Sequence, residues 1–508
     1  MFITDFANDK QLAYSIYNNY RSLGHLIDGQ KPSSRKLIYT CSKLTKFDKV
    51  DTIANKTAGD TQYLHGSVNL EGVLKGMNND YSGTNIIPLF EKEGFFGTRT
   101  ETNCGASRYV KSRLSTITSN IILKEDYDVL IEQEFEGYKI EPKYYVPIIP
   151  LIFVNGSEGI GNGFSHRITT RNPVEIIKYL FDELDGKETS TLMPYYNDFK
   201  GTITRDNQNH LKYYIQGCLE VKNTTTIIID ELPVGYTLPK YISILEDLED
   251  KKIIKEYTDK SNKNKFYFEV KVSRELTSNS IEKLYDIFKL NTSSTENLTV
   301  IDENNMIREF DNVRDMMNHY IKIRLEYYVK RKEYLINKMK LDITILENRI
   351  KFINDILNDV IIFKGKKKTQ IEKQLKDLNY YKDESYDYLL NMNIHSLTED
   401  KISDLENRLS KLIQELEEYL NKDVTMIWKE ELNNLLVALG EKKLRVNQSR
   451  LEDIIKPIDN INLEEIQKIE KFKQEISNEL AIPKTLLFNS DEGLSKIKSE
   501  DIKLDDLF

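Results

Sequence analysis

Apolar positions near the start of the chain recur at helical spacing in two segments that a short turn separates. The first helix is predicted in residues 9–22, with one face formed by Ala13, Ile16, Tyr17 and Tyr20. Asp28 and Gly29 supply the turn, and Pro32 suits the first turn of a second helix. The buried stripe of that helix would be Leu37, Ile38, Cys41 and Leu44, with Arg35 and Lys36 facing outward. The pattern predicts helix, turn, helix.

Residues 105–115, GASRYVKSRLS, alternate as a β-strand does. One face would carry Tyr109, Lys111 and Arg113, and the other Val110 and Leu114. The alternation predicts a phenol that lies among cations.

A long apolar run precedes a glycine-rich segment between residues 142 and 170. The run PIIPLIFV predicts a strand that feeds the loop NGSEGIGNGFS. This loop lacks the Gly-Lys-Ser/Thr ending of a phosphate-binding P-loop and the βαβ context of a dinucleotide fingerprint. We therefore do not interpret it as a nucleotide site.

The second half of the chain changes from strands to long helices. Strand candidates YYIQGCLEV and TTTIIIDELP in residues 200–275 predict a second, α/β domain. After about residue 310, apolar residues at alternating spacings of three and four predict a long coiled-coil helix: Ile321, Leu325, Tyr328, Leu335, Met339, Leu346, Ile350, Ile353 and Leu357. A second seam predicts a helix that returns against the first: Ile402, Leu405, Leu409, Leu412, Leu416 and Leu420.

Several features of the helical region have two interpretations. Polar Lys332 and Asp342 interrupt the first seam, either to set its register or because the helix is solvated there. Residues 364–398 must turn the chain around, and their opening KGKKKTQ is either a solvated loop or a nucleic-acid contact. The segment from residue 431 would be a helical, acidic tail.

Length and composition place the chain among ordered proteins. At 508 residues, of which 39% are hydrophobic and 30% charged, about three domains are expected. No run of about twenty apolar residues and no secretory signal is present, so we expect an intracellular, cytoplasmic protein, in the host cytoplasm if it is viral. Cys41, Cys104 and Cys218 lie too far apart for a zinc or disulfide framework.

The net charge of −9 hides a basic segment near the start of the chain. Residues 21–50 have a local balance of +5, because two aspartates, Asp28 and Asp48, stand against seven cations: Arg21, Lys31, Arg35, Lys36, Lys43, Lys46 and Lys49. The overall acidity therefore does not exclude a nucleic-acid partner.

Four segments together resemble the type IIA topoisomerases: DGQKPSSRKLIY, YLHGSVNLEG, GFFGTRTETNCGASRYVKSRLS and PIIPLIFVNGSEGIGNGFS. The similarity covers about residues 1–430 and is greatest to the medium subunit of T-even phage topoisomerases, with gyrase A subunits and the C-terminal half of eukaryotic topoisomerase II more distant. It implies a mixed α/β multidomain fold that is rich in helices. The implied domains are a winged-helix DNA-cleavage domain at 1–170, an α/β tower at 171–310, antiparallel coiled-coil arms at 311–430 with a small exit-gate tip near 364–398, and a tail at 431–508.

The resemblance implies that Tyr109 attacks a DNA backbone phosphate and holds the 5′ end as a transient phosphotyrosine. Arg108 would stabilise the five-coordinate phosphorus, although phosphate binding alone would also explain it. His65 matches the histidine of the family's His-Gly step and would hydrogen-bond near the scissile phosphate, although a lone loop histidine is more often structural. Arg35 matches the arginine after Lys-Pro and would hold the cleaved strand.

Further DNA contacts follow from the same comparison. Lys31, Lys36, Lys111 and Arg113 are candidate phosphate contacts. Ile160 aligns with the wedge residue that enters a base step and bends DNA, although it could be a simple hydrophobic anchor. Two positions depart from the family pattern: Leu64 replaces a second histidine and Ser34 replaces a glutamine, so no role is carried over to either.

The family's chemistry requires parts that the sequence does not display. Strand cleavage uses divalent metal held by an acidic cluster of a Toprim fold, and strand passage uses ATP. We find neither motif, so we expect no metal ligand in this chain and expect Mg²⁺ and ATP to be bound by a separate Toprim/ATPase subunit.

Cutting both strands of a duplex requires two copies of Tyr109, which predicts a homodimer joined through the coiled-coil arms. The segment after Trp428 is too short for a DNA-wrapping β-pinwheel, so relaxation or decatenation is expected instead of supercoiling.

Two other functions would fit part of the pattern. A non-enzymatic helix-turn-helix protein on a coiled-coil dimer would explain the basic residues and heptads, but not Arg108 with Tyr109 or the glycine-rich loop with Ile160. A tyrosine recombinase would need spaced Arg and His residues before a C-terminal Tyr, a pattern that we do not see.

Overall fold

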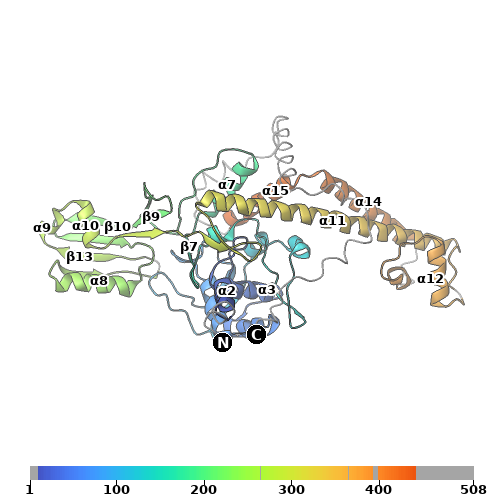
Figure 1. Cartoon of the computed structure of the whole chain (residues 1–508), viewed down its shortest axis with the longest axis horizontal. Helices are drawn as coiled ribbons and strands as arrows, with labels where there is room; N and C mark the ends of the chain where they lie inside the picture. Colours follow the sequence, from blue (N-terminus) through green and yellow to red (C-terminus); the bar gives the residue numbers. More distant parts are fainter. Residues whose placement is uncertain (1–9, 264, 364, 393–398, 442–508) are drawn as a thin grey trace. The chain divides into compact units, whose positions relative to one another are not determined.

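The computed structural model describes residues 10–263, 265–363, 365–392 and 399–441 (Figure 1). Within them the chain forms two compact units. The first comprises the described parts of Met1–Ile122, Ile131–Ile321 and the chain from Leu432, and the second comprises Leu123–Leu130 and Lys322–Glu431. The result is a helix-rich, mixed α/β protein. None of its described helices is both long enough and apolar enough to cross a membrane.

The N-terminal part of the first unit is a group of short helices beside a small sheet. The helices are α2 Leu12–Ser22, α3 Pro32–Cys41, α4 Val50–Asp60 and α5 Ser67–Met77. The antiparallel sheet has the order β1-β3-β2, with β1 Asp48–Lys49, β2 Phe90–Glu93 and β3 Lys111–Leu114. Further elements are the 3-10 turn η2 Thr116–Asn120 and the hairpin β4 Glu134–Phe135 and β5 Tyr138–Lys139.

The predicted order of helix, turn and helix is confirmed by α2 and α3. Gly29 makes the turn with a φ of 67°, and a Cβ there would meet Ile152 N at 2.5 Å, so only glycine fits. Leu37, Ile38 and Cys41 are buried as predicted. The predicted stripe on the first helix holds only in part: Ala13, Tyr17 and Tyr20 are half-buried, but Ile16 is exposed, and the buried residue of α2 is Asn19.

The glycine-rich region differs from its prediction. The apolar run forms the short helix α6 Leu151–Val154, whose four side chains are all buried, and not a strand. Strand structure appears only after it, in the hairpin of β6 Ser157–Ile160 and β7 Ser165–Ile168. Burial on all sides suits a short core helix as well as a buried strand, so periodicity could not separate the two. Helix α7 Pro173–Leu184 and the hairpin of β15 Thr299–Ile301 and β16 Ile307–Glu309 complete this part.

The predicted strands of residues 200–275 are confirmed in two antiparallel sheets. One has the order β10-β11-β13-β12, from Cys218–Asn223, Thr226–Glu231, Phe268–Val272 and Ile254–Asp259. The other has the order β14-β9-β8, from Asn291–Thr295, Lys212–Gln216 and Thr202–Arg205. Helices α8 Leu238–Asp250, α9 Arg274–Thr277 and α10 Ile281–Ile287 accompany the first sheet (Figure 1). Tyr241 and Leu245 of α8 share its core with Phe268 and Val270.

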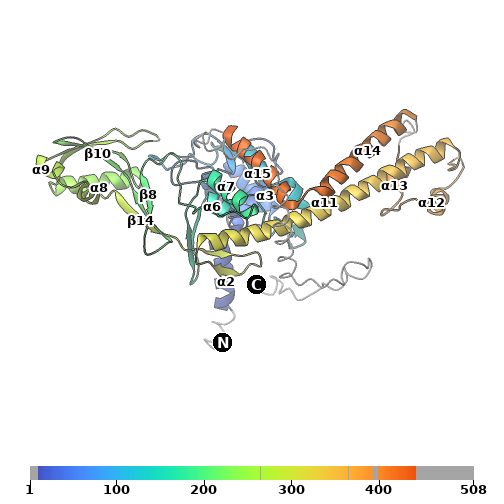
Figure 2. The ribbon, with the colours of Figure 1, turned by 90° about the horizontal axis from the view of Figure 1, so that it is seen from above.

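The second unit is built on one long helix. Helix α11, Val313–Leu357, has 45 residues and begins in the first unit. The other helices are α12 Lys368–Asp377, α13 Asp387–Leu390, α14 Glu399–Asn421 and α15 Val424–Glu441, the last ending in the first unit. Figures 1 and 2 show α14 returning beside α11, and α12 near the far end of α11.

The two predicted seams pack against each other. Leu346 and Ile353 of α11 share a core with Leu405, and the other side chains packed on it include Ile350, Ile402, Leu409 and Leu412. The Lys332 ammonium donates to the Leu420 carbonyl at 3.0 Å. Position 332 thus lies near 420, whereas 346–353 lie near 402–412, so the pair is antiparallel. Lys332 binds the Leu420 carbonyl of α14 and the Lys422 carbonyl just after it, which accounts for one polar seam position, while Asp342 is exposed.

The chain turns around through a small core of its own. Phe352 of α11 packs with Leu375, Tyr380, Tyr386 and Leu389 of residues 365–392, as the predicted reversal of the chain requires. Residues 393–398 lie outside the described part. Residues 431–441, at the start of the predicted helical tail, continue helix α15 and bury Leu432, Leu435, Leu436 and Leu439. Residues 442–508 lie outside the described part.

A charged network is buried where α11 meets the 3-10 turn η3, Lys124–Val129. Arg324 donates two hydrogen bonds to Asp126, at 2.9 and 3.1 Å. Arg331 reaches the same carboxylate at 3.3 Å and also Glu431. Tyr328 donates to Glu431 at 2.5 Å. Two arginines on one face of a helix, seven residues apart, thus lie inside the second unit and not in solvent.

Candidate active site

Tyr109 lies in a turn that directly precedes β3. Its backbone N–H donates to the Ala106 carbonyl at 2.9 Å, while Ser107 and Val110 on either side of the Arg-Tyr pair are buried. The Tyr109 side chain is 75% exposed. Arg108 is exposed as well, and its guanidinium carbon lies 5.4 Å from the centre of the Tyr109 ring. The turn therefore presents a phenol and a guanidinium together to solvent.

Glycines allow two segments to pass closely behind this turn. A Cβ on Gly105 would lie 2.9 Å from Val110 Cγ1, and one on Gly94 would lie 3.1 Å from the same atom. Gly105 also donates its N–H to the Phe95 carbonyl at 2.9 Å. Val110 is thus packed closely beneath the turn that carries Tyr109.

The cations of β3 already have partners. The predicted alternation holds from 110 to 113, since Val110 and Ser112 are buried and Lys111 and Arg113 are not, whereas Leu114 is only half-buried. Lys111 pairs with Glu93 at 3.1 Å, and Arg113 donates to Glu91 at 2.7 and 2.9 Å. Both carboxylates come from the neighbouring strand β2, so cross-strand pairing accounts for the cations. Their predicted DNA contacts stay predictions.

His65 lies in the turn between α4 and α5, with one ring nitrogen engaged. Its Nε2 is 2.6 Å from the Tyr17 hydroxyl of α2, and the Tyr63 ring meets it edge-on with centres 5.4 Å apart. Partial burial and the nearby Arg21 guanidinium lower the pKa of His65 below its usual 6.5. Both effects favour the neutral form of the ring. Within the described residues, no hydrogen bond links His65 to Arg108 or Tyr109.

The prediction that α3 carries Arg35 and Lys36 outward is wrong. Arg35 is 1% exposed and donates to Asp28 at 2.7 and 3.1 Å. Burial by itself would lower the pKa of Arg35, but the Asp28 charge and hydrogen bond outweigh it and raise the pKa. Lys36 donates to the Thr61 carbonyl and to Glu141, both at 2.9 Å. These cations hold the turn before α3 and the end of α4.

Lys31 is also engaged. Its ammonium donates to the Glu158 carbonyl of β6 at 2.8 Å, and partial burial lowers its pKa. Of the three basic residues predicted on this segment as DNA contacts, none points freely into solvent. Sequence reasoning failed here because a count of charges does not show which carboxylates or carbonyls the fold brings to them.

Ile160 lies at the tip of the β6–β7 hairpin and is 81% exposed. The hairpin closes through Gly161 N–H to the Phe164 carbonyl at 2.8 Å. A Cβ on Gly159 would lie 1.9 Å from Ser22 O, and one on Gly161 would lie 2.0 Å from Asn19 Oδ1. The glycines on either side of Ile160 therefore allow the hairpin to press against α2.

Asn162 fixes this hairpin to α2 and was missed from the sequence. Its N–H donates to Asn19 Oδ1 at 2.7 Å, and Asn19 Nδ2 returns a bond to the Asn162 carbonyl at 3.1 Å. Its side chain accepts from Asn18 at 2.9 Å and donates to Ser15 at 3.2 Å. Four hydrogen bonds thus hold the loop beside the exposed Ile160. The only sequence signal was the row of amides on the first helix.

A second missed contact joins two of the sequence motifs. Arg99 of GFFGTR donates to Glu231 of IIIDELP at 2.9 Å and to the Leu232 carbonyl at 3.2 Å. Both side chains are nearly buried, at 9% and 2% exposure. The loop that leads to the Tyr109 turn is therefore fastened to the end of β11.

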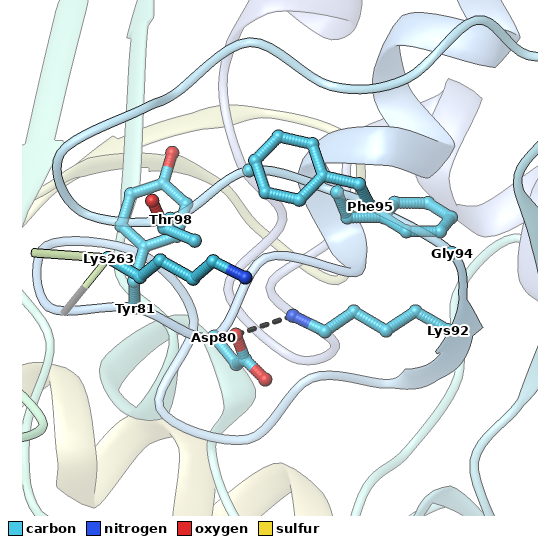
Figure 3. Close-up of a pocket in the computed structure, with 9 residues that line it drawn as sticks. Asp80, Tyr81, Lys92, Gly94, Phe95, Thr98 and Lys263 are labelled. Atoms are coloured by element: carbon cyan, nitrogen blue, oxygen red, sulfur yellow. Dashed lines mark hydrogen bonds and ion pairs between the residues drawn. The ribbon is translucent and has the colours of Figure 1, made fainter.

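A cavity of about 330 Å³ opens beside the same loop (Figure 3). Its lining includes Phe95 and Thr98, and Lys92 pairs there with Asp80 at 2.6 Å. Figure 3 shows the Lys263 ammonium directed toward the same space. Across the described residues, no group of three or more His, Cys, Asp or Glu side chains could hold a metal ion.

Comparison with known proteins identifies the family. The family model for the DNA gyrase/topoisomerase IV A subunit matches residues 21–433. The chain is 32% identical over 480 residues to DNA topoisomerase 2 of Plasmodium falciparum, covering 86% of this chain and 34% of that protein. It is 31% identical over 448 residues to DNA topoisomerase 2 of Invertebrate iridescent virus 6, covering 85% of this chain and 38% of that protein.

A solved structure agrees. The crystal structure of the Plasmodium falciparum topoisomerase II DNA-binding, cleavage and re-ligation domain superposes with a TM-score of 0.78 at 30% identity, covering 93% of this chain and 65% of that one. The chain spans only about 34% to 38% of the two curated relatives named above. The resemblance to type IIA topoisomerases is thus confirmed, while the greater similarity to the phage medium subunit stays a prediction. With a family model that matches most of its length, the chain belongs to the family of DNA gyrase/topoisomerase IV A subunits.

Proposed function

We propose that this chain breaks and rejoins DNA as part of an ATP-dependent type IIA topoisomerase, with Tyr109 as the nucleophile. The observation that carries the proposal is the Tyr109 side chain, 75% exposed beside the exposed Arg108 in a member of this family. A transient 5′-phosphotyrosine link would permit passage of a second duplex, and hence relaxation and decatenation.

The chemistry follows from exchange of one ester for another. The Tyr109 phenol oxygen attacks a backbone phosphorus, a new O–P bond forms, and the bond from phosphorus to the 3′ oxygen breaks. The phenol gives up its proton and the leaving 3′ oxygen gains one. The number of phosphoester bonds is conserved, so rejoining requires no outside energy. A phenol with a pKa of about 10 is a better leaving group for the reverse step than an alkyl hydroxyl.

Four other side chains have proposed roles in binding the phosphate, bending the duplex or supporting the site. Arg108 is free to turn its forked donors toward the five-coordinate phosphorus. A neutral His65 can donate a hydrogen bond to a phosphate oxygen. Ile160, exposed on a hairpin that is fixed at its base, would enter a base step and bend the duplex. Because Arg35 is buried against Asp28, it would support the turn before α3 instead of touching the cleaved strand directly.

Two copies of the chain are proposed to act on one DNA segment. Each copy supplies one Tyr109, and cutting two antiparallel strands requires a two-fold arrangement. The end of α11 and the segment after it expose four apolar side chains, Leu357, Val360, Ile362 and Phe363. Such a patch favours contact with a second copy, as the predicted exit gate near residues 364–398 requires.

The metal and the nucleotide are proposed to lie elsewhere. The described residues hold no cluster that fits Mg²⁺, so no step of the mechanism is assigned to a metal held by this chain. A separate Toprim/ATPase subunit, on one or two polypeptides, would bind Mg²⁺ and ATP.

We also propose the division into cleavage domain, tower, coiled-coil arms and tail at residues 1–170, 171–310, 311–430 and 431–508, and an intracellular location.

The test is capture of the covalent intermediate. The purified chain is mixed with a Toprim/ATPase partner, supercoiled DNA and magnesium, then denatured rapidly, and protein attached to 5′ ends is measured. Tyr109→Phe should abolish the adduct and leave DNA binding nearly unchanged, whereas Tyr138→Phe, a change at another exposed tyrosine, should alter neither the adduct nor DNA binding. An undiminished adduct in Tyr109→Phe would remove the assignment, and DNA binding without any adduct in the native chain would favour a non-enzymatic DNA-binding protein.

A further inference from the structure

Helix α2 places a phenol directly against the proposed catalytic histidine. Tyr17 is half-buried, and its hydroxyl lies 2.6 Å from His65 Nε2. The two rings are stacked with centres 6.2 Å apart and an angle of 28° between their planes. The Arg21 guanidinium lies 5.6 Å from the Tyr17 ring centre, one helical turn along α2. Neither Tyr17 nor this contact carries a role in the chemistry described so far.

Tyr63 and Arg21 are the other groups that act on the His65 ring. Tyr63, from its own loop, meets the ring edge-on, and the Tyr63 hydroxyl is 3.2 Å from Ser33 Oγ of α3. Partial burial lowers the pKa of the His65 ring, and the charge of Arg21 of α2 lowers it further. Among the described residues, Tyr17 makes the hydrogen bond to the His65 ring, and none bonds to Nδ1.

A neutral imidazole has one nitrogen that donates and one that accepts. A phosphate oxygen only accepts, so His65 must offer it an N–H. Because Nε2 is occupied by Tyr17, the nitrogen left for DNA is Nδ1. This nitrogen carries the proton only when Nε2 accepts, and a phenol, with a pKa of about 10, is an O–H donor at neutral pH.

We propose that Tyr17 is a positioning residue, whose hydroxyl donates to His65 Nε2 and so fixes the ring in the tautomer that presents Nδ1–H to a DNA phosphate. The role toward phosphate rests on the function proposed above. The hydrogen bond itself does not, because it is a property of the protein without DNA.

The placement of Tyr17 also connects two parts of the site. Asn18 and Asn19, the next residues of α2, hold Asn162 beside the exposed Ile160. One short helix therefore orients the histidine through Tyr17 and the hairpin with the DNA wedge through its amides. Helix α2 therefore fixes the distance between His65 and the hairpin that carries Ile160.

The first test reads the tautomer without any DNA. The chain is labelled with ¹⁵N-histidine, and the signal of His65, one of six histidines, is assigned with His65→Gln. We expect Nδ1 to be protonated and Nε2 to be unprotonated in the native chain. Tyr17→Phe keeps the ring and removes the hydroxyl, so both ¹⁵N shifts should move toward the average of a mixture of tautomers. Tyr14→Phe on the exposed face of the same helix is the matched control and should change neither. Unchanged His65 shifts in Tyr17→Phe would overturn the proposal.

The second test measures what the hydrogen bond does. Tyr17→Phe should slow adduct formation at saturating DNA by about 10-fold, because the net contribution of one hydrogen bond corresponds to a change of that size. The DNA concentration at half-saturation should stay within about twofold, because Tyr17 does not touch DNA in this proposal. In a His65→Ala background the same change should have no further effect.

The outcomes separate the two proposals. A native-like rate of adduct formation in Tyr17→Phe contradicts the positioning role only. A loss confined to DNA affinity also contradicts it, because Tyr17 would then be a binding contact. A native chain that forms no adduct, with the tautomer fixed as expected, contradicts the proposed function.

Discussion

Two groups of cations in this protein differ in what the fold does with them. Arg35 and Lys36 of α3, with Lys31 just before it, lie in the basic segment of residues 21–50, yet each is engaged by a carboxylate or a carbonyl. Arg108 lies outside that segment, yet it is exposed, and within the described residues no carboxylate pairs with it. The comparison shows that local charge density in sequence does not predict where a cation is available to DNA.

The largest expected effect is on the free energy of unfolding, when the buried Arg35 is replaced. Arg35→Met should lower the free energy of unfolding by about 3–5 kcal/mol, because Asp28 would stay buried without its partner. Urea unfolding followed by circular dichroism measures this. The matched control is Lys111→Met, which removes an exposed pair and should cost at most about 1 kcal/mol. Equal costs in the two variants would mean that the Arg35 pair is not the structural element that its burial indicates.

Arg108→Ala should slow strand cleavage and leave the stability of the protein unchanged. Its stability should stay within about 0.5 kcal/mol of the native value, because the side chain is exposed. The rate of strand cleavage should fall by about 10²–10³-fold, the usual loss when one donor to a developing negative charge is removed. Quenched cleavage with the Toprim/ATPase partner measures the rate. If the only effect is on salt-dependent binding, Arg108 is a phosphate contact and no more.

The smallest effect is expected at the hairpin. Ile160→Ala removes an exposed side chain, so it should not change stability, but DNA labelled at both ends should bend less on binding. Fluorescence transfer between the ends measures the bend. Asn162→Ala provides the comparison: it keeps Ile160 but loosens the hairpin from α2, and it should reduce the bend to a smaller extent. Native transfer efficiency in Ile160→Ala would leave Ile160 without a role as a wedge.

In the second unit, too, the sequence does not predict which cations are buried. Arg324 and Arg331 lie on a long helix whose apolar seam was evident from the sequence, yet both are buried against Asp126. Asp126 lies 198 residues before Arg324 and 205 residues before Arg331, so no local pattern could associate them. The Tyr17–His65 and Arg99–Glu231 contacts could not be predicted for the same reason.

Local periodicity by itself determined α2 and α3, the alternation around β3, the strands of residues 200–275 and the two seams of the coiled coil, because each depends on side chains a few residues apart. The motif around Arg108 and Tyr109 indicated the family and its chemistry for a related reason, since the reacting groups are adjacent in the chain. Only the tertiary structure decided that Arg35 is buried, that the run before the glycine-rich loop is a helix, and that Asn162 and Tyr17 attach the hairpin and His65 to α2. Burial and pairing of polar groups depend on partners distant in sequence, and folding alone brings those partners together.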